Sequence, residues 1–167
     1  MIEVKKAEKK TEFKIIEELA EEILHEVYDP IIPAEHTRYF LKKFQSENAI
    51  RNQINNENFS YFLLKFDDKN VGYLGVQKLD NKLILSKLYI LKSFRGLKIG
   101  KTALEYVNNL AMNQGIEKIE LIVNQQNQNT IDIYLKNGFK IIESMMNSFP
   151  NGHSVKDYKM EKVLSTT

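Results

Sequence analysis

The sequence predicts an α+β fold, in which helices cover both faces of a mixed, mostly antiparallel sheet in a three-layer α/β/α arrangement. Helical periodicity occupies residues 11–54, alternating apolar runs occupy residues 59–91, and helices alternate with short apolar strands from residue 96 onward. A helix separates the strands expected at 83–91 and 119–123. Because such a crossover is right-handed and joins parallel strands, we expect this pair to be parallel.

The first part of the chain is expected to form one edge strand and three helices. Residues 2–6 alternate apolar and polar side chains, as a half-exposed strand does. Apolar residues then recur at helical spacing from Thr11, the expected N-cap, to Tyr28, where an Asp-Pro step ends the helix. Two more helices are expected over residues 34–45 and 46–54.

The remaining elements follow from turn signals and from changes in periodicity. We expect strands over residues 59–66, 71–79 and 83–91, a helix over 96–113, a strand over 119–123, a helix over 127–136, and strands over 139–145 and 155–163.

Length and composition favour a single domain spanning residues 1–167. With 43% apolar residues, a chain of this length can bury a core without staples. The net charge of +2, from 24 basic and 22 acidic residues, is too balanced for a protein that binds nucleic acid through bulk electrostatics. No apolar run reaches the roughly 20 residues of a membrane helix, and the charged N-terminus lacks a signal-peptide pattern. We therefore expect a cytoplasmic protein without membrane or nucleic-acid partners.

Metal and thiolate chemistry have no basis in the sequence. The chain contains no cysteine, which excludes a thiolate nucleophile and a zinc-thiolate site. His25, His36 and His153 are widely spaced and show no metal-ligand pattern, so we expect no metal.

The strongest chemical signal is the bend between the strand at 83–91 and the following helix, Arg95-Gly-Leu-Lys-Ile-Gly100-Lys101. The first N–H groups of a helix are unpaired and partly positive, so they suit phosphate oxygens. Gly96 and Gly100 remove side chains where phosphates would approach, and the basic residues add charge. The alternative is an ordinary solvated turn.

A second signal follows the buried strand at 119–123. Six consecutive asparagine and glutamine residues, 124–129, follow it and lead into a short amphipathic helix that contains Tyr134. Asn127 can cap this helix or bond a ligand's carbonyl, and Tyr134 can belong either to the core or to a site.

Together the two segments resemble the GCN5-related N-acetyltransferase (GNAT) family. In that family, Gln/Arg-x-x-Gly-x-Gly/Ala follows the fourth strand and cradles the pyrophosphate of acetyl-CoA, and Arg95–Gly100 matches this pattern. The family's Asn-x-x-Ala-x-x-x-Tyr-x-x-x-Gly-Phe matches residues 127–139. The resemblance implies a central parallel pair splayed at its carboxyl ends, and direct transfer of an acetyl group from acetyl-CoA to an amine.

Two positions depart from the family pattern. Lys98 stands where the family usually has its middle glycine, and Thr130 stands where alanine is common. A lysine held at positive φ would cost about 1–2 kcal/mol. We expect instead that Lys98 has right-handed helical geometry, because it lies at a helix start, and that its ammonium group aids phosphate binding.

The resemblance also implies roles for individual residues. A backbone N–H among Leu88, Tyr89 and Ile90 would polarise the thioester carbonyl, and Tyr134 would serve the departing sulfur. The implied cofactor contacts are Leu88, Tyr89, Ile90, Arg95, Gly96, Leu97, Lys98, Ile99, Gly100, Lys101, Asn127 and Tyr134.

The general base is not evident, because the strand at 83–91 has no carboxylate where many relatives place a glutamate. We name Glu26, which lies on the rim of the first helix's apolar face, as the candidate. His36, Asp29, Glu143 and a water chain are alternatives.

The sequence is compatible with more than one function, acceptor and oligomeric state. The missing strand carboxylate leaves a non-catalytic acyl-CoA-binding module as an alternative function. The acceptor amine is unidentified, and residues 26–46 would border its site. A homodimer is also expected from the family resemblance. The first helix has a glutamate-rich face at residues 17, 18, 21 and 22. This face is either simply solvated or attracts a cationic amine substrate.

Overall fold

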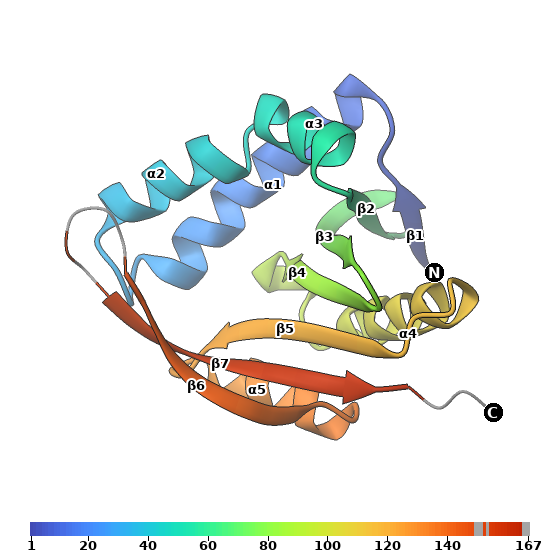
Figure 1. Ribbon diagram of the computed structural model, residues 1–167. Coiled ribbons are helices and arrows are strands. Elements are labelled where there is room, and N and C mark those ends of the chain that lie inside the picture. Colours follow the sequence, from blue (N-terminus) through green and yellow to red (C-terminus); the bar gives the residue numbers. More distant parts are fainter. Residues whose placement is uncertain (149–151, 153, 165–167) are drawn as a thin grey trace. The chain divides into compact units, whose positions relative to one another are not determined.

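The computed structural model of the chain describes residues 1–148, 152 and 154–164. His153 lies outside the described residues. Seven strands form one sheet in the order β1-β2-β3-β4-β5-β7-β6, and five α-helices accompany them (Figure 1). The elements are β1 (Ile2–Lys6), α1 (Lys10–Tyr28), α2 (Ala34–Phe44), α3 (Glu47–Asn56), β2 (Phe59–Phe66), β3 (Lys69–Leu79), β4 (Lys82–Ile90), a 3-10 turn (Lys92–Phe94), α4 (Ile99–Asn113), β5 (Lys118–Asn124), α5 (Gln128–Lys136), β6 (Lys140–Ser148) and β7 (Ser154–Val163).

The predicted fold class is confirmed. The β4–β5 pair is parallel, whereas β1–β2, β2–β3, β5–β7 and β6–β7 are antiparallel. The parallel ladder contains only three pairs, from Lys82–Lys118 to Ile84–Glu120, although β4 continues to Ile90 and β5 to Asn124. The ladder therefore stops well before the carboxyl ends of its strands.

The chain forms two compact units, of which the first contains residues 1–77 and 87–106. Its core joins the apolar face of α1 to the side chains of β2 and β3 that point to the same side, including Tyr61 and Leu63. The intervening Phe62 points to the opposite face of the sheet, where its ring lies 5.2 Å from that of Tyr106 on α4. Helices therefore cover both faces of the sheet within this unit.

A buried polar network fixes the junction between α2 and α3. The Tyr73 hydroxyl donates to Gln45 Oε1, Gln45 Nε2 donates to the Tyr61 hydroxyl, and Tyr61 donates to Gln53 Oε1. Gln45 and Gln53 also donate to the carbonyl of Phe44. Because each buried polar group has a partner, the network holds the end of α2 in one place at little desolvation cost.

The second unit contains residues 78–86 and the chain from Val107 onward. Seven residue pairs join β5 to β7, from Lys118–Val163 to Asn124–Asp157, and β6 pairs with the other edge of β7. Along β5, Ile119, Leu121 and Val123 are buried while Ile122 is half-exposed, as expected for a strand with one covered face.

Most predicted helix and strand bounds lie within two residues of the observed ones, but the prediction that Thr11 caps α1 is wrong. The helix begins at Lys10, because Glu12 Oε1 accepts hydrogen bonds from the N–H groups of Glu8 and Lys9, both at 3.0 Å. The expected cap of α3 is confirmed, since Ser46 Oγ accepts from the N–H of Ala49 at 3.2 Å.

Among the residues that the structure describes, no helix is both long and apolar enough to cross a membrane.

Candidate functional site

The bend between β4 and α4 has an unusual backbone. Gly96 has φ +82° and Lys98 has φ +67°, so two residues lie in the left-handed region before the helix starts. The predictions that α4 begins at residue 96 and that Lys98 is right-handed are therefore wrong. Lys98 occupies a conformation that favours glycine, at a cost of about 1–2 kcal/mol.

This backbone leaves a row of hydrogen-bond donors. Thr102 is the first residue of α4 whose N–H finds an acceptor, the carbonyl of Lys98 at 3.1 Å. Among the described residues, the N–H groups from Gly96 to Lys101 have no such partner. A Cβ placed on Gly100 would meet only Ile90 Cδ1, at 3.6 Å. Unpaired donors at a helix start, flanked by exposed basic side chains, fit a diphosphate.

The guanidinium group of Arg95 is held by Glu26 on α1 and is not free to turn toward this bend. Its Nη1 and Nη2 donate to Glu26 Oε1 and Oε2 at 2.9 and 2.6 Å, and its Nε donates to the carbonyl of Ile90 at 3.1 Å. The structure thus brings together two residues that the sequence named separately. Hydrogen bonds from Arg95, opposed by burial, lower the pKa of Glu26, which makes this carboxylate a weaker base while the pair is intact.

The end of β4 packs closely against β3. A Cβ on Gly72 would lie 2.3 Å from the carbonyl oxygen of Tyr89, so only glycine permits this approach. The N–H of Leu91 donates to the carbonyl of Val71 at 2.8 Å, which removes it as a donor for a ligand. Gly72 is a positioning residue that sequence reasoning missed, and an isolated glycine within a strand was its only signal.

Aromatic hydroxyls and one lysine surround this end of β4. The hydroxyls of Tyr89 and Tyr28 lie 3.0 Å apart. Lys87 Nζ lies 5.8 Å from the ring centre of Phe59, and burial lowers the pKa of Lys87 to about 8. Sequence reasoning did not single out Lys87, because burial of a lysine is a tertiary property.

Asn127 and Tyr134 belong to the second unit. Asn127 occupies the N-cap position of α5, but its side chain makes no cap hydrogen bond. Among the described residues that side chain has no partner, so its amide is available to a ligand. Tyr134 is 7% exposed, and its ring centre lies 5.5 Å from that of Phe139.

The residues named as alternative general bases are buried, paired with a histidine or close to a lysine. His36 is buried in α2, and the Asp29 carboxylate lies 2.9 Å from His25 Nδ1. Glu143 on β6 is half-exposed and lies 3.9 Å from Lys159. Within the described ranges, no group of three acidic or histidine side chains could hold a metal ion.

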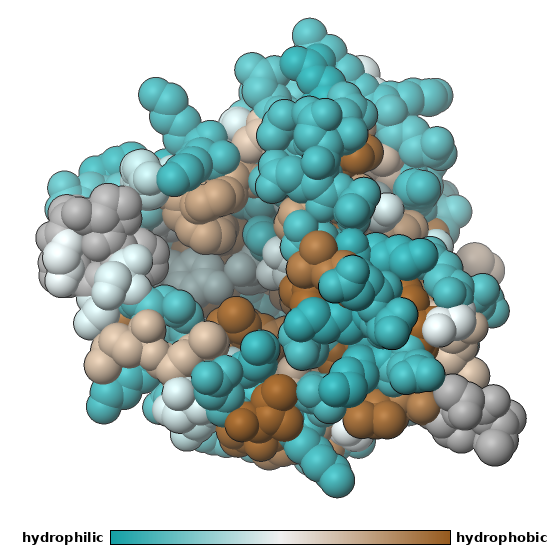
Figure 2. Space-filling view, viewed as in Figure 1, coloured by the Kyte–Doolittle hydropathy of each residue, from teal (hydrophilic) through white to brown (hydrophobic). Residues whose placement is uncertain are grey.

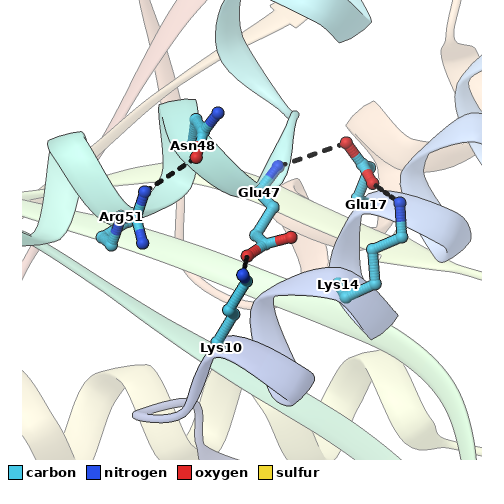
Figure 3. A network of polar contacts seen from close by, with 6 residues as sticks. All are labelled: Lys10, Lys14, Glu17, Glu47, Asn48 and Arg51. Atoms are coloured by element: carbon cyan, nitrogen blue, oxygen red, sulfur yellow. Dashed lines mark hydrogen bonds and ion pairs between the residues drawn. The ribbon is translucent and has the colours of Figure 1, made fainter.

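The glutamate-rich face of α1 is partly used in structural contacts. Glu17 accepts from Lys14 on its own helix and from the N–H of Glu47 on α3, and Lys10 lies 3.9 Å from the Glu47 carboxylate (Figure 3). A groove of about 280 Å³ lies between α1 and α2 in this unit. Its lining carries both signs of charge: Glu17, Glu21, His25, Arg38, Leu41, Lys42, Gln45 and Ser46.

Comparison with known proteins agrees with this geometry. Residues 20–139 match the model of the acetyltransferase (GNAT) family. The chain is 30% identical over 128 residues to spermidine N(1)-acetyltransferase of Thermoplasma acidophilum, which covers 74% of this chain and 80% of that protein. It is also 28% identical over 137 residues to an uncharacterized N-acetyltransferase of Mycobacterium tuberculosis, covering 81% and 86%.

Solved structures give the same result. The PaiA N-acetyltransferase of Thermoplasma acidophilum, in complex with coenzyme A, superposes with a TM-score of 0.80 at 25% identity, covering 98% of this chain and 99% of that one. The ribosomal-protein-S18-alanine N-acetyltransferase of Escherichia coli shares the fold, with a TM-score of 0.76 at 16% identity and coverage of 100% and 96%. The chain therefore belongs to the GNAT acetyltransferase family and is an N-acetyltransferase that uses acetyl-CoA as its acetyl donor.

Proposed function

We propose that this enzyme transfers an acetyl group directly from acetyl-CoA, bound along Arg95–Lys101, to a primary amine of a polyamine. The observation that carries the cofactor half of the proposal is the row of backbone donors from Gly96 to Lys101 without protein acceptors among the described residues. Acetyl-CoA supplies the activated thioester. The bend holds its pyrophosphate through backbone N–H groups, and Lys98 and Lys101 add positive charge.

In this proposal the end of β4 stabilises the developing oxyanion. The donor that the family resemblance implies is a backbone N–H among Leu88, Tyr89 and Ile90; the N–H of Leu91 is bonded to the carbonyl of Val71. The close approach at Gly72 keeps this segment rigid, which favours preorganised stabilisation.

Tyr134 serves the sulfur in this scheme, and the half-buried Asn127 amide binds the cofactor arm. A free tyrosine hydroxyl has a pKa of about 10 and a free thiol about 8.5, so full proton transfer from a tyrosine to a thiolate is uphill by roughly 2 kcal/mol with these ordinary values. Tyr134 therefore acts mainly by donating a hydrogen bond to the departing sulfur.

The proposed role of Glu26 depends on its ion pair with Arg95. While the two side chains are paired, Glu26 holds the guanidinium group at the start of the bend. As the proposed base it takes the ammonium proton only after Arg95 has moved to a phosphate oxygen, because pairing keeps its pKa low.

The acceptor class rests on the spermidine N(1)-acetyltransferase of Thermoplasma acidophilum, the 30%-identical relative. A polyamine is a small cation, and recognition of its ammonium groups requires carboxylates with oxygens free to accept hydrogen bonds.

We further propose that the whole chain acts as one catalytic domain in the cytoplasm, where acetyl-CoA is available, and that it forms a homodimer through the edge strand β6. Ile141, Ile142 and Met146 on this strand are 44%, 49% and 60% exposed. Figure 2 shows that the visible face is mostly hydrophilic, with hydrophobic residues gathered in a few patches. Edge strands with exposed apolar side chains tend to pair. Sedimentation at micromolar concentration tests this: wild type should sediment as a dimer, and Ile142→Lys as a monomer.

The function is tested by measuring thiol release from saturating acetyl-CoA with a panel of acceptors: spermidine, spermine, putrescine, amino acids and peptides with free N-termini. We expect the highest kcat/KM for a polyamine. A higher kcat/KM for peptide N-termini or amino acids would contradict the polyamine assignment and leave the acetyl donor unchanged.

A further inference from the structure

One buried acidic side chain differs from the others in the described part of the chain. Three acids are buried there, Glu12, Glu120 and Asp157, with exposed fractions of 7%, 8% and 9%. Glu12 lies 3.2 Å from Lys5 Nζ, and Glu120 lies 3.1 Å from Lys82 Nζ. Asp157 has no such cation among the described residues. The nearby Lys159, two residues along the same face of β7, lies instead 3.9 Å from Glu143.

The surroundings of Asp157 hold it in one orientation without neutralising it. Asn147 Nδ2 on β6 donates to Asp157 Oδ2 at 2.6 Å. Gln125 Nε2 donates to the Asp157 carbonyl at 3.2 Å and to Ser144 Oγ at 2.8 Å. Within the described residues, Oδ1 of Asp157 accepts no hydrogen bond, so this oxygen is available to a further donor.

The location is the carboxyl end of β5. Asp157 is the β7 partner of Asn124, the last residue of β5, whereas the parallel ladder with β4 ends four residues earlier, at Glu120. We call Asn124, Gln125, Ser144, Asn147 and Asp157 the Asp157 corner. It lies beside the part of β5 that has no β4 partner, and α5 with Tyr134 begins four residues after Asn124.

We propose that Asp157 is an acceptor-binding residue, whose Oδ1 binds an ammonium group of the amine substrate. A buried carboxylate without a cation is costly to the folded protein, and the missing partner is a cation with N–H donors. A protonated amine supplies both, and a charge-assisted hydrogen bond to a carboxylate is stronger than one between neutral groups.

The role is binding rather than proton removal. An alkyl ammonium group has a pKa of about 10 and an aspartic acid about 4, so an ammonium group that Asp157 binds away from the reacting nitrogen keeps its proton. Burial raises the pKa of Asp157, and the hydrogen bond from Asn147 opposes the rise. The pKa of Asp157 is therefore closer to that of an ammonium group than an ordinary aspartic acid's, but the ammonium group still keeps its proton. In a polyamine, Asp157 would therefore bind an ammonium group other than the nitrogen that is acetylated. This step rests on the polyamine assignment proposed above.

The test is steady-state kinetics of Asp157→Asn, with spermidine as the acceptor. The variant keeps the shape and the contact with Asn147 but loses the charge. We expect KM for spermidine to rise at least tenfold while KM for acetyl-CoA stays unchanged. Asp132→Asn is the matched control, because Asp132 is an exposed aspartate of the same unit, bonded to Gln128, and its variant should match wild type.

A thermal melt separates binding from a structural role. A carboxyl group whose pKa is raised in the folded protein opposes folding when it is ionised, and this opposition is present at neutral pH and relieved as pH falls through that pKa. Asp157→Asn should therefore melt at the same temperature as wild type or higher at pH 7. An unchanged KM for spermidine, or a variant that fails to fold, would overturn the proposal.

Failure of the polyamine assignment is recognised separately. If wild type prefers another amine in the acceptor panel, the same comparison is made with that amine. A selective rise in its KM supports Asp157 as the acceptor-binding residue, and equal KM values in the two proteins overturn it.

Discussion

The cofactor bend, residues 95–101, and the Asp157 corner present opposite solutions to ligand binding. The bend is one continuous segment whose donors are backbone N–H groups, and its two positive-φ residues set their direction. The corner assembles side chains from β5, β6, β7 and the turn after β5, and its carboxylate is buried without a cation. In this account the bend binds the acetyl donor, and the corner binds the acceptor.

The two kinds of site should differ in how well they tolerate substitution. A backbone site depends on the space and the dihedral angles of a few residues, so most side-chain changes in it should be mild. A side-chain site depends on one charge and its orientation, so a change of a single atom type should be selective.

The largest effect on activity is expected for Tyr134→Phe. This substitution tests the chemical step, in which neither the bend nor the Asp157 corner takes part directly. If the hydroxyl donates to the departing sulfur, kcat should fall by about tenfold to a thousandfold, with acetyl-CoA affinity nearly unchanged. Steady-state kinetics between pH 6 and 10 measures this. Tyr106→Phe is the control, because Tyr106 packs against Phe62 and should keep full activity. An unchanged kcat for Tyr134→Phe would place the residue in the core only.

Most of the bend could be predicted from the sequence, because the residues proposed to bind the phosphates are consecutive. Glycines at 96 and 100 after a strand already predicted a phosphate cradle. The conformation of Lys98 was not predictable from its residue type, since lysine rarely adopts positive φ; the glycine that the family usually has at this position was the signal for it. The same strain delays the start of α4 to Ile99.

A smaller effect is expected for Lys98→Gly, which separates the bend's geometry from its charge. Replacing the left-handed lysine by glycine should relieve about 1–2 kcal/mol of strain in the folded protein. The greater conformational entropy of glycine in the unfolded chain offsets part of this gain in the free energy of unfolding. Denaturant unfolding should show equal or greater stability. Acetyl-CoA affinity should fall by no more than about tenfold, since only one exposed charge is lost. Collapse of binding would mean that the Lys98 side chain, not the backbone, holds the phosphates.

The smallest effect on stability is expected for Glu26→Gln, which here tests the ion pair between α1 and the bend and not the proposed role of Glu26 as the base. Half-exposed ion pairs contribute roughly 0–1 kcal/mol. A carboxyl group with a lowered pKa stabilises the fold at pH values above its ordinary value of 4.5 and loses this contribution as pH falls through the lowered value. The variant should melt slightly below wild type at pH 7, and the two should converge in acid. A gap that widens in acid would contradict the assigned ion pair.

The Asp157 corner was not predictable, although each of its strands was. The strand at 155–163 alternates in a way that places Asp157 beside Lys159 and Glu161 on one face, a pattern typical of a solvated strand. Only the tertiary structure shows that Asp157 is buried and Glu161 is paired with Lys118 at 3.5 Å. Glu26 was predicted as a base from helical geometry, which carries no information about a partner 69 residues away.

Calorimetric titration of acetyl-CoA into Gly100→Ala tests whether the backbone of the bend holds the pyrophosphate. The protein itself has room for the added methyl group, whose nearest neighbour would be Ile90 Cδ1 at 3.6 Å, and alanine should favour helix α4 by about 0.5–1 kcal/mol. Any loss of affinity therefore reports on the ligand. We predict that the variant melts no lower than wild type and binds acetyl-CoA at least tenfold more weakly. Equal affinity in the two proteins would show that the pyrophosphate does not lie against this backbone.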